Sequence, residues 1–226
     1  MQAPTNDPHY PGGAKCTSGF PAKSNVNGAI YVTVAAHCYD PYDTRMWSGT
    51  SGIYMGHVTS LSLSNDVGFV KVSDAGNSAV PEIYDGGYGN DSSLKNVVGY
   101  ETLTPNHQIC VSGSYTRLAC SMVVLNVNQQ FNAVNPYSGA GYTVHGALVA
   151  SATGQVAFTG GDSGGAAFAN TNGNTQALAA GFMSAGYSPY TVACPSWVGA
   201  GAVCASAGLV TPAANIASGN NVAFTW

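Results

Sequence analysis

The sequence contains few charged residues, and this shortage excludes several functions. Ten acidic and six basic side chains make up 7% of the 226 residues, against about 25% in an average soluble domain. Six scattered basic residues cannot neutralise a phosphate backbone, so we exclude nucleic acid as a partner. No uninterrupted apolar run reaches the roughly 18 residues that a membrane-spanning helix needs, so we exclude a membrane partner as well.

Recognisable metal and cofactor motifs are also missing. The six cysteines form no C-x-x-C pair, the five histidines lie far apart, and no H-E-x-x-H motif occurs. We therefore expect no metal and no cofactor. Two carboxylates, Asp40 and Asp43, suit calcium, but a solvated turn is the preferred interpretation. Asn90 begins the one N-glycosylation sequon, which matters only in a eukaryotic source.

Glycine and proline are abundant instead, with 29 and 11 residues, as is typical of short strands joined by turns. Apolar and β-branched runs predict strands at residues 30–36, 67–72, 121–127, 142–149, 175–182 and 222–226. Helical periodicity is almost absent. Thr211 and Pro212 resemble an N-cap and a first helical residue, which predicts one short helix through Ala217. The fold class is therefore all-β.

A break in the strand pattern at residues 99–108 predicts two halves, residues 1–103 and 104–226, each with about six strands. Two β-barrels fit this pattern, and so does a single sandwich. The widely spaced and even set of cysteines predicts three disulfides and an oxidising compartment. The polar start has no targeting segment, so we expect a mature, secreted chain from which a signal has been removed, with a cleaved pro-segment as a further candidate.

Three residues suggest nucleophilic catalysis. Ser163 lies within G-G-D-S-G-G, where glycines permit a tight turn and backbone N–H groups that converge on an oxyanion. His37 follows an apolar strand, which would give a base a rigid mount, and Asp66 precedes a buried strand, where it could orient an imidazole. Each residue alone also fits a structural role. Together they follow one of the known chain orders of a catalytic triad.

Across nearly its whole length the chain resembles the chymotrypsin-fold serine proteases, above all secreted bacterial enzymes similar to streptogrisins and α-lytic endopeptidase. The matching motifs, in the family's order, are C-T-S-G-F at 16–20, A-A-H-C at 35–38, N-D-V-G at 65–68, C-V-S-G at 110–113 with Cys120, G-D-S-G-G at 161–165 and S-A-G at 184–186. The resemblance implies two antiparallel six-stranded β-barrels and a short C-terminal helix. A triad would lie between the barrels.

The resemblance also implies roles for single residues. Ser163 would be the nucleophile, His37 the base, and Asp66 the group that orients the base. The N–H groups of Gly161 and Ser163 would form the oxyanion hole. Ser184 would support Asp66. The residues expected to bind substrate are Ala157, Phe158, Met183, Ser184, Ala185 and Gly186, with Ala157 at the base of the primary pocket.

The implied disulfides are Cys16–Cys38 and Cys110–Cys120, which leaves Cys194 and Cys204 as the third pair. The sequence departs from the family at Thr159, where a cysteine usually stands. The segment 142–158 also lacks the arginine with which bacterial relatives meet the aspartate before the nucleophile. Asp162 is therefore expected to meet either backbone N–H groups or His145.

These observations predict a secreted, monomeric serine endopeptidase that works through an acyl-enzyme. With no charge expected in the primary pocket, we predict a preference for an uncharged, apolar residue on the acyl side of the cut. Its partners would be polypeptide substrates, with a cleaved pro-segment or proteinaceous inhibitors as further candidates. The alternatives are a catalytically silent binding homologue and an esterase that uses the same triad.

Overall fold

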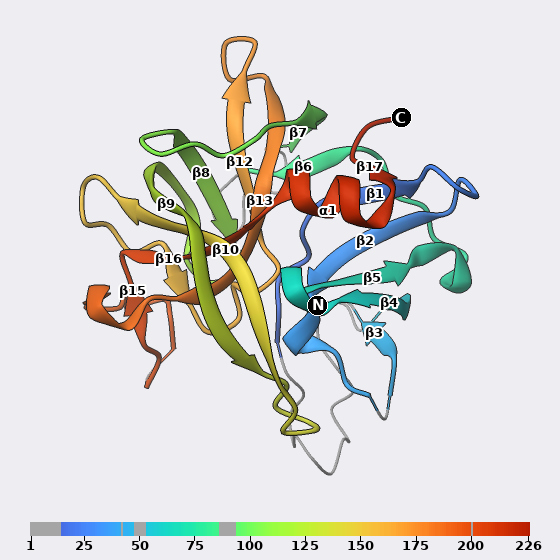
Figure 1. Ribbon diagram of the computed structural model, residues 1–226, viewed down its shortest axis with the longest axis horizontal. Helices are drawn as coiled ribbons and strands as arrows, with labels where there is room; N and C mark the ends of the chain where they lie inside the picture. The colour runs from blue at the N-terminus through green and yellow to red at the C-terminus, as the bar shows by residue number, and fades with distance from the viewer. Residues whose placement is uncertain (1–14, 42, 48–52, 86–93, 200) are drawn as a thin grey trace.

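A computed structural model describes residues 15–41, 43–47, 53–85, 94–199 and 201–226, and nearly all of its regular structure is β (Figure 1). The first half contains β1 (Pro21–Ser24), β2 (Ile30–Ala35), β3 (Arg45–Trp47), β4 (Tyr54–Ser62), β5 (Val67–Lys71), β6 (Glu82–Tyr84) and β7 (Leu94–Tyr100). Three short 3₁₀ turns interrupt them: η1 (Ala36–Cys38), η2 (Leu63–Asn65) and η3 (Val72–Ala75).

The second half has longer strands and the one α-helix of the described residues. Its strands are β8 (Gln108–Gly113), β9 (Arg117–Val134), β10 (Gly141–Ser151), β11 (Phe158–Thr159), β12 (Ala166–Thr171), β13 (Gln176–Gly186), β14 (Thr191–Val192), β15 (Cys204–Ala205), β16 (Ala207–Pro212) and β17 (Val222–Ala223). The turn η4 (Ser188–Tyr190) follows β13, and α1 (Ala213–Asn220) lies between β16 and β17.

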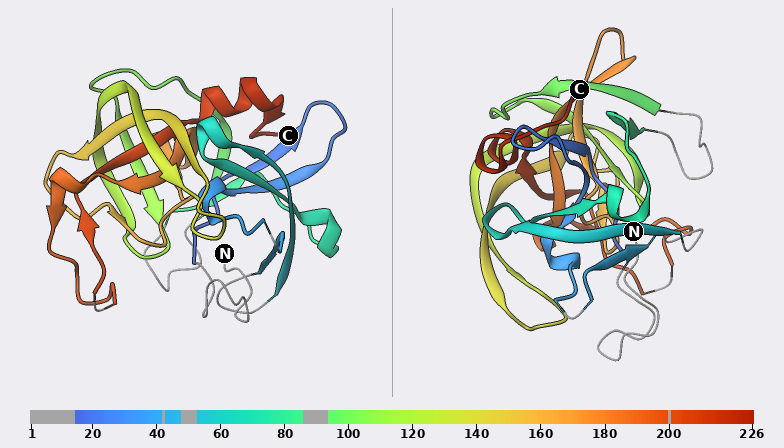
Figure 2. Two further views of the ribbon diagram at one scale, coloured as in Figure 1. Left: turned by 60° about the horizontal axis from the view of Figure 1, so that its bottom comes forward. Right: turned by 90° about the vertical axis from the view of Figure 1, so that its right-hand side faces the viewer.

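These strands form two large sheets and one small one. The first sheet has the order β17-β1-β2-β5-β4-β3, and the second has the order β12-β8-β9-β10-β16-β13-β7-β6. Because β12 also pairs with β13, the six strands from β12 to β13 are hydrogen-bonded in a ring. The strands β11, β15 and β14 form the small sheet. Figure 2 shows the two large sheets side by side.

The distribution of strands meets the expectation of two six-stranded barrels only in part. Strands β6 and β7 precede residue 103, yet they extend the second sheet, where β7 runs parallel to β13. Strand β17 lies near the other end of the chain and pairs with β1 of the first sheet. Among the described strands, only the second sheet closes into a ring. Each half thus lends strands to cover an edge of the other half's sheet, which protects that edge from other chains.

The C-terminal helix is present, but the predicted N-cap is wrong by one residue. Thr211 is the penultimate residue of β16, where it pairs with Phe182, and Pro212 occupies the N-cap position of α1. The side chain of Thr211 is fully buried and donates a hydrogen bond to the carbonyl oxygen of Phe182. This pairing keeps Thr211 extended, so the helix begins only at Ala213.

A cluster of aromatic rings joins the two large sheets. Phe20 leads into β1, Phe182 belongs to β13, and Phe224 follows β17. The ring of Phe182 lies 5.3 Å from that of Phe20 and 5.8 Å from that of Phe224, and all three rings are buried. Edge-on and tilted contacts of this kind add to the free energy gained by burial. The packing therefore fixes how the two sheets meet.

All six cysteines are paired, as Cys16–Cys38, Cys110–Cys120 and Cys194–Cys204. The first pair ties the segment before β1 to η1. The second joins β8 to β9, and the third encloses the segment between β14 and β15.

Non-reducing peptide mapping should recover these three pairs and no free thiol. Replacing both Cys110 and Cys120 by Ala should lower the free energy of unfolding by about 2–3 kcal/mol, because that disulfide closes a loop between residues ten positions apart. Urea denaturation of the double variant measures the loss. A crossed pairing, or a double variant as stable as the parent, would contradict the role of these cross-links.

Candidate active site

His37 is held rigidly at the end of a buried strand. Strand β2 ends at Ala35, and the chain then makes the single turn η1, in which His37 is the middle residue. The backbone N–H of His37 donates to Oδ1 of Asp66 (3.0 Å), and its ring Nδ1 lies 2.8 Å from Oδ2 of the same residue. The neighbouring Cys38 is locked to Cys16. Backbone and ring are therefore both fixed, while the side chain keeps 23% of its exposure.

Asp66 is almost fully buried and lies in the left-handed region, with φ 48° and ψ 43°, between η2 and β5. Aspartate tolerates this conformation better than most residues. Its carboxylate accepts two hydrogen bonds from His37, a third from the hydroxyl of Tyr142 (2.8 Å) and a fourth from that of Ser184. These donors come from three separate segments of the chain. The buried carboxylate thus connects the two halves.

Burial alone would raise the pKa of Asp66, but the hydrogen bond and charge of His37, with the hydroxyls of Ser184 and Tyr142, hold it below its usual range. Burial also raises the pKa of Tyr142, and the adjacent Asp66 raises it further. The phenol therefore stays protonated and remains a donor. The stability that Asp66 contributes is present above its unfolded pKa and is lost as the pH falls through the folded value.

Ser184 reaches Asp66 because β13 is irregular at this point. The register between β13 and β16 shifts between Met183 and Ala185, which places a bulge at Ser184. Bulges redirect side chains from the regular alternation of a strand. The irregularity lets Ser184 turn its hydroxyl towards Asp66 while Ala185 and Gly186 continue to pair with β16.

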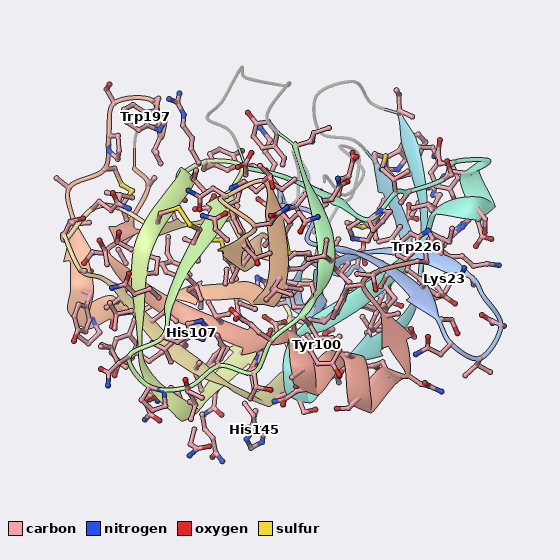
Figure 3. The ribbon with its side chains drawn as sticks, turned by 90° about the horizontal axis from the view of Figure 1, so that it is seen from above. Lys23, Tyr100, His107, His145, Trp197 and Trp226 are labelled. Atoms are coloured by element: carbon pink, nitrogen blue, oxygen red, sulfur yellow. A yellow bond between two sulfur atoms is a disulfide. The ribbon has the colours of Figure 1, made fainter. Side chains whose placement is uncertain are left out.

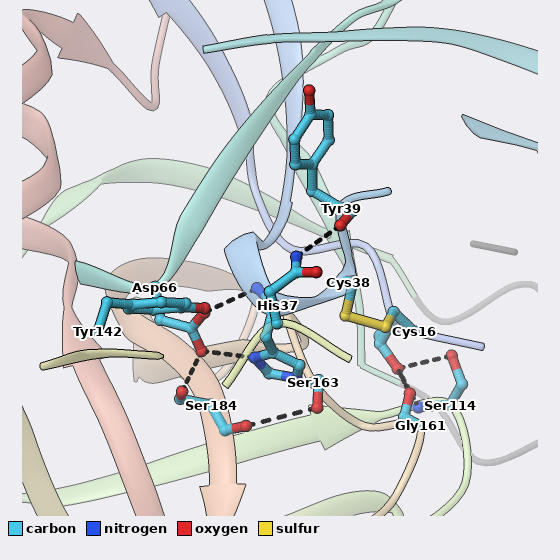
Figure 4. Close-up of a disulfide and its surroundings, with 12 residues drawn as sticks. Cys16, His37, Cys38, Tyr39, Asp66, Ser114, Tyr142, Gly161, Ser163 and Ser184 are labelled. Carbon is cyan, nitrogen blue, oxygen red and sulfur yellow. Dashed lines mark hydrogen bonds and ion pairs between the residues drawn. A yellow bond between two sulfur atoms is a disulfide. The ribbon is translucent and has the colours of Figure 1, made fainter. Parts of the chain in front are cut away.

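Ser163 lies on the other side of His37. Figure 4 shows the imidazole of His37 between the carboxylate of Asp66 and the side chain of Ser163. The Ser163 hydroxyl donates a hydrogen bond to the carbonyl oxygen of Ser184 (3.4 Å). The structure therefore brings together the three residues that the sequence proposed as a triad, two from the first half and one from the second.

The glycine before Asp162 has a conformation that other residues rarely adopt. Gly161 has φ +99°, and a Cβ there would approach the ring of Tyr115 to 2.5 Å. Among the described residues, neither the N–H of Gly161 nor that of Ser163 donates to a protein acceptor. These are the two N–H groups that the sequence analysis assigned to an oxyanion hole, and both remain available for a ligand.

Asp162 is the second buried carboxylate of the site, and its partners decide between the two alternatives left open by the sequence. Oδ1 accepts the N–H groups of Tyr115 (2.9 Å) and Thr116 (3.2 Å), while Oδ2 accepts the N–H of Thr159 (2.9 Å) and the hydroxyl of Thr116 (2.7 Å). His145 takes no part, since it is exposed at the edge of the molecule (Figure 3). Backbone donors and one threonine hydroxyl are therefore the partners of Asp162.

Burial raises the pKa of Asp162, although its four donors act in the opposite direction. The stability that this carboxyl contributes is therefore greatest below its unfolded pKa, and it falls as the pH rises through the folded value. Asp66 has the opposite dependence. The two buried carboxyl groups therefore oppose each other as the solution is acidified.

The hairpin of β9 and β10 reaches across to the first half and fixes the site from outside. The amide of Asn135, at its tip, donates to the carbonyl oxygen of Tyr39, just after η1 (2.7 Å). Tyr142, on β10, donates to Asp66 as described above. Sequence reasoning missed both residues. A polar side chain at a hairpin tip and a tyrosine in an otherwise apolar strand are weak signals, because their partners lie far away in the chain.

A pocket of about 420 Å³ adjoins His37 and Ser163. One wall contains Met183, Ser184, Ala185 and Gly186, which the sequence assigned to substrate binding, together with Phe158. The structure adds Ser188, Thr191, Val203 and Ala205 to the lining. It also adds residues 131–134 of β9, which the sequence analysis did not identify. His37 and Asp162 are the titratable residues among the described lining residues.

The assignment of Ala157 to the base of this pocket is corrected by the structure. Ala157 is fully buried, packs in the core cluster with Val149 and Met183, and is not part of the pocket lining. Its N–H donates to the carbonyl oxygen of Ala205, which holds its backbone in the core. Its neighbour Phe158 packs in the same core cluster and also lines the pocket.

The remaining candidate sites from the sequence are the calcium site at Asp40 and Asp43 and the glycosylation sequon at Asn90. The carboxylate of Asp43 accepts a hydrogen bond from Nε of Arg45 (2.8 Å), and no group of three acidic, histidine or cysteine residues within the described ranges is arranged to hold a metal ion. Asn90 lies outside the described residues. In the part of the chain that the structure describes, no helix has the length and apolar character needed to cross a membrane.

Comparison with known proteins shows the fold. No protein-family model and no curated protein sequence matches this chain. Among solved structures, a glutamic acid-specific serine protease matches with 24% identity and a TM-score of 0.63 over 92% of both chains. A Nocardiopsis protease matches with 22% identity and a TM-score of 0.62 over 94% of both. Thermobifida fusca protease A matches with 22% identity and a TM-score of 0.60, over 92% of this chain and 90% of the other. The chain therefore has the chymotrypsin-like fold of bacterial serine proteases.

Replacing Asp162 by Asn keeps the shape of the side chain but places an NH₂ group against N–H donors. At least one buried donor then loses its acceptor, so we expect the free energy of unfolding to fall by about 1–3 kcal/mol in urea denaturation. The matched control is Asp74→Asn, which removes an exposed ion pair with Lys71 and should cost less than about 1 kcal/mol. Equal losses in the two variants would refute the structural role of Asp162.

Proposed function

We propose that the protein is a serine endopeptidase that cleaves peptide bonds through an acyl-enzyme. The observation that supports this most is the arrangement of Asp66, His37 and Ser163 beside a pocket of about 420 Å³. The fold agrees with it, because the matching solved structures are those of serine proteases. The catalytic group lies between residues 1–103, which supply His37 and Asp66, and residues 104–226, which supply Ser163. We propose these two halves as the domains.

In the first step, Oγ of Ser163 attacks the carbonyl carbon of the substrate and its proton passes to Nε2 of His37. Asp66 holds Nδ1 of the same ring, fixes its tautomer and stabilises the imidazolium. The N–H groups of Gly161 and Ser163 donate hydrogen bonds to the carbonyl oxygen of the substrate as it becomes negative. His37 then gives its proton to the leaving amine. Water then attacks the carbonyl carbon of the acyl-enzyme through the same proton transfers, which releases the acid and restores Ser163.

A polypeptide substrate fits the surroundings of Ser163. The end of β13, residues 184–186, lines the pocket next to the nucleophile and offers backbone groups to an extended peptide, which would pair with it as an added strand. Three disulfides support secretion into an oxidising environment. We propose a monomer that acts outside the cell, with a cleaved pro-segment or proteinaceous inhibitors as further partners.

The pocket favours an uncharged side chain on the acyl side of the cut. Its walls near Ser163 contain Phe158, Met183 and Ala205, and the carboxylate of Asp162 is occupied by its four donors. A charged side chain would lose its hydration there without gaining a partner. One matching structure is of a glutamic acid-specific enzyme described as using a histidine triad in substrate binding. Among the described lining residues of this chain, His37 is the only histidine, so we do not propose glutamate specificity.

The Ser163→Ala variant should fold normally and lose turnover of a peptide substrate by about 10⁴- to 10⁶-fold in kcat. The loss follows from removing the only atom that can form the acyl-enzyme. The matched control is Ser218→Ala, an exposed serine on α1, which should keep the activity of the parent. Substantial turnover by purified Ser163→Ala would end the assignment.

Two alternatives are separated by labelling with a serine-directed phosphonate followed by digestion of casein. A labelled protein that digests casein supports the endopeptidase. Labelling without digestion indicates an esterase, and an unlabelled protein indicates a binding homologue that has kept the scaffold. The contact between Asp66 and His37 favours an active enzyme, because it holds the imidazole in the orientation that a general base requires.

A peptide library should show apolar residues, with no charge, on the acyl side of the cut bond. The pocket lining described above provides contact area for them but no partner for a charge. Cleavage sites identified by mass spectrometry measure the preference. A profile dominated by Arg, Lys or Glu would refute the proposed specificity and leave the endopeptidase assignment intact.

A further inference from the structure

Thr17 contacts the nucleophile loop, residues 160–165, from the opposite half of the molecule. It lies between Cys16 and β1, in the first half of the chain. Its backbone N–H donates to the carbonyl oxygen of Ser163 (2.9 Å), and its hydroxyl donates to the carbonyl oxygen of Gly161 (2.8 Å). Two polar groups of one residue therefore hold two carbonyl groups of that loop.

The two residues held by Thr17 are the same two whose N–H groups point to no acceptor. Gly161 and Ser163 supply the N–H groups of the proposed oxyanion hole, and Thr17 binds the carbonyl oxygen of each. The carbonyl of Gly161 shares one planar peptide group with the N–H of Asp162, so the hydrogen bond from Thr17 holds that plane. The N–H of Gly161 belongs to the preceding peptide group and is linked to the held plane through the φ and ψ angles of Gly161. Anchoring this plane restricts both angles, and with them the direction of that N–H.

The loop has particular need of an anchor because it begins with two glycines. Gly160 and Gly161 have access to far more backbone conformations than other residues, and Gly161 has φ +99°. The family's usual cysteine is replaced by Thr159, whose hydroxyl donates to the carbonyl oxygen of Val203 (2.9 Å) instead of forming a cross-link. Asp162 secures the middle of the loop. The carbonyl of Gly161 is held by Thr17.

The hydroxyl of Thr17 is itself oriented. It accepts the N–H of Ser114 (2.9 Å), and the hydroxyl of Ser114 lies at the same distance. With its single proton directed to Gly161, the Thr17 hydroxyl accepts from Ser114 in both contacts. A threonine side chain has few rotamers, so its oxygen stays in place.

Thr17 is also connected covalently to the base. Its neighbour Cys16 is bonded to Cys38, which follows His37 directly (Figure 4). The loop packs closely on the same region, because a side chain at Gly164 would collide with the carbonyl oxygen of Thr17. The mount of the base and the anchor of the loop thus form one unit in the first half of the chain.

We propose that Thr17 is a positioning residue for the oxyanion hole, whose hydroxyl holds the backbone of Gly161 and thereby sets the direction of the N–H group of Gly161. This role rests on the proposed endopeptidase function. The geometry required is that of the tetrahedral intermediate, so the effect falls on kcat and leaves KM nearly unchanged. If Thr17 had a structural role alone, its replacement would lower thermal stability without a loss of kcat at nearly unchanged KM.

Three variants of Thr17 test the role. Thr17→Val keeps the shape and the backbone N–H but removes the hydroxyl, Thr17→Ala removes it with a smaller side chain, and Thr17→Ser restores it. With a peptide amide substrate we expect Val and Ala to lower kcat by about 10- to 100-fold, with KM within about threefold of the parent. Thr17→Ser should recover most of the rate. The matched control is Thr59→Val, which removes an exposed hydroxyl that donates to the carbonyl oxygen of Phe69 on β5, and it should leave kcat unchanged.

A peptide boronic acid gives a second readout, because its tetrahedral adduct places an oxygen in the hole. The inhibition constant should rise in Thr17→Val and Thr17→Ala by about the same factor as kcat falls. If the parent is active and both variants match Thr59→Val in kcat and in boronate affinity, the role of Thr17 is refuted while the endopeptidase stands. If the parent neither hydrolyses peptides nor reacts with a phosphonate, the proposed function fails and the role of Thr17 fails with it.

Discussion

The carboxylate of Asp66 is the constraint on which the site depends. A buried charge is costly unless hydrogen bonds replace its lost hydration, and here four donors do so. They reach it from η1, β10 and β13, so satisfying one side chain fixes the positions of three elements from both halves. His37 acquires its orientation, Tyr142 secures the long hairpin, and Ser184 locates the end of β13 beside the pocket. The geometry of the site and the docking of the two halves have the same physical origin.

The nucleophile loop follows the same logic with a second buried carboxylate. Asp162 collects three backbone N–H groups and one hydroxyl, which fixes a glycine-rich segment. Thr159 contributes twice, since its N–H binds Asp162 and its hydroxyl binds the carbonyl of Val203. A network of short polar contacts therefore holds the nucleophile loop. Such a network suits a chain with only six basic residues.

The sequence alone predicted the features that depend on local patterns. The β-rich class and most strand cores follow from motifs that can be read without distant partners, while the disulfide pairing and the roles of His37, Asp66 and Ser163 came from the resemblance to a known family. For Asp162 the sequence left two alternatives, of which the structure shows the backbone donors. Features that depend on long-range geometry were not predicted: the contacts of Tyr142 and Thr17 and the β9 wall of the pocket. Ala157 packs in the core outside the pocket lining, and α1 begins one residue later than the Thr211 pattern predicts because Thr211 pairs with Phe182. Both outcomes depend on packing and strand pairing between segments that are distant in the sequence.

The exchange of strands between the two sheets has a consequence for how the molecule assembles. Strands β6 and β7 lie at the end of the first half and extend the sheet of the second, and β17 lies at the end of the second half and extends the sheet of the first, with Lys23 opposite Ala223. Each sheet therefore takes an edge strand from the other half of the sequence. Because β1 pairs with β17 near the other end of the chain, folding must close a very long loop before these contacts form, and this slows folding. Two fragments produced by a single break between β7 and β8 should each stay incomplete in isolation and recover structure on mixing.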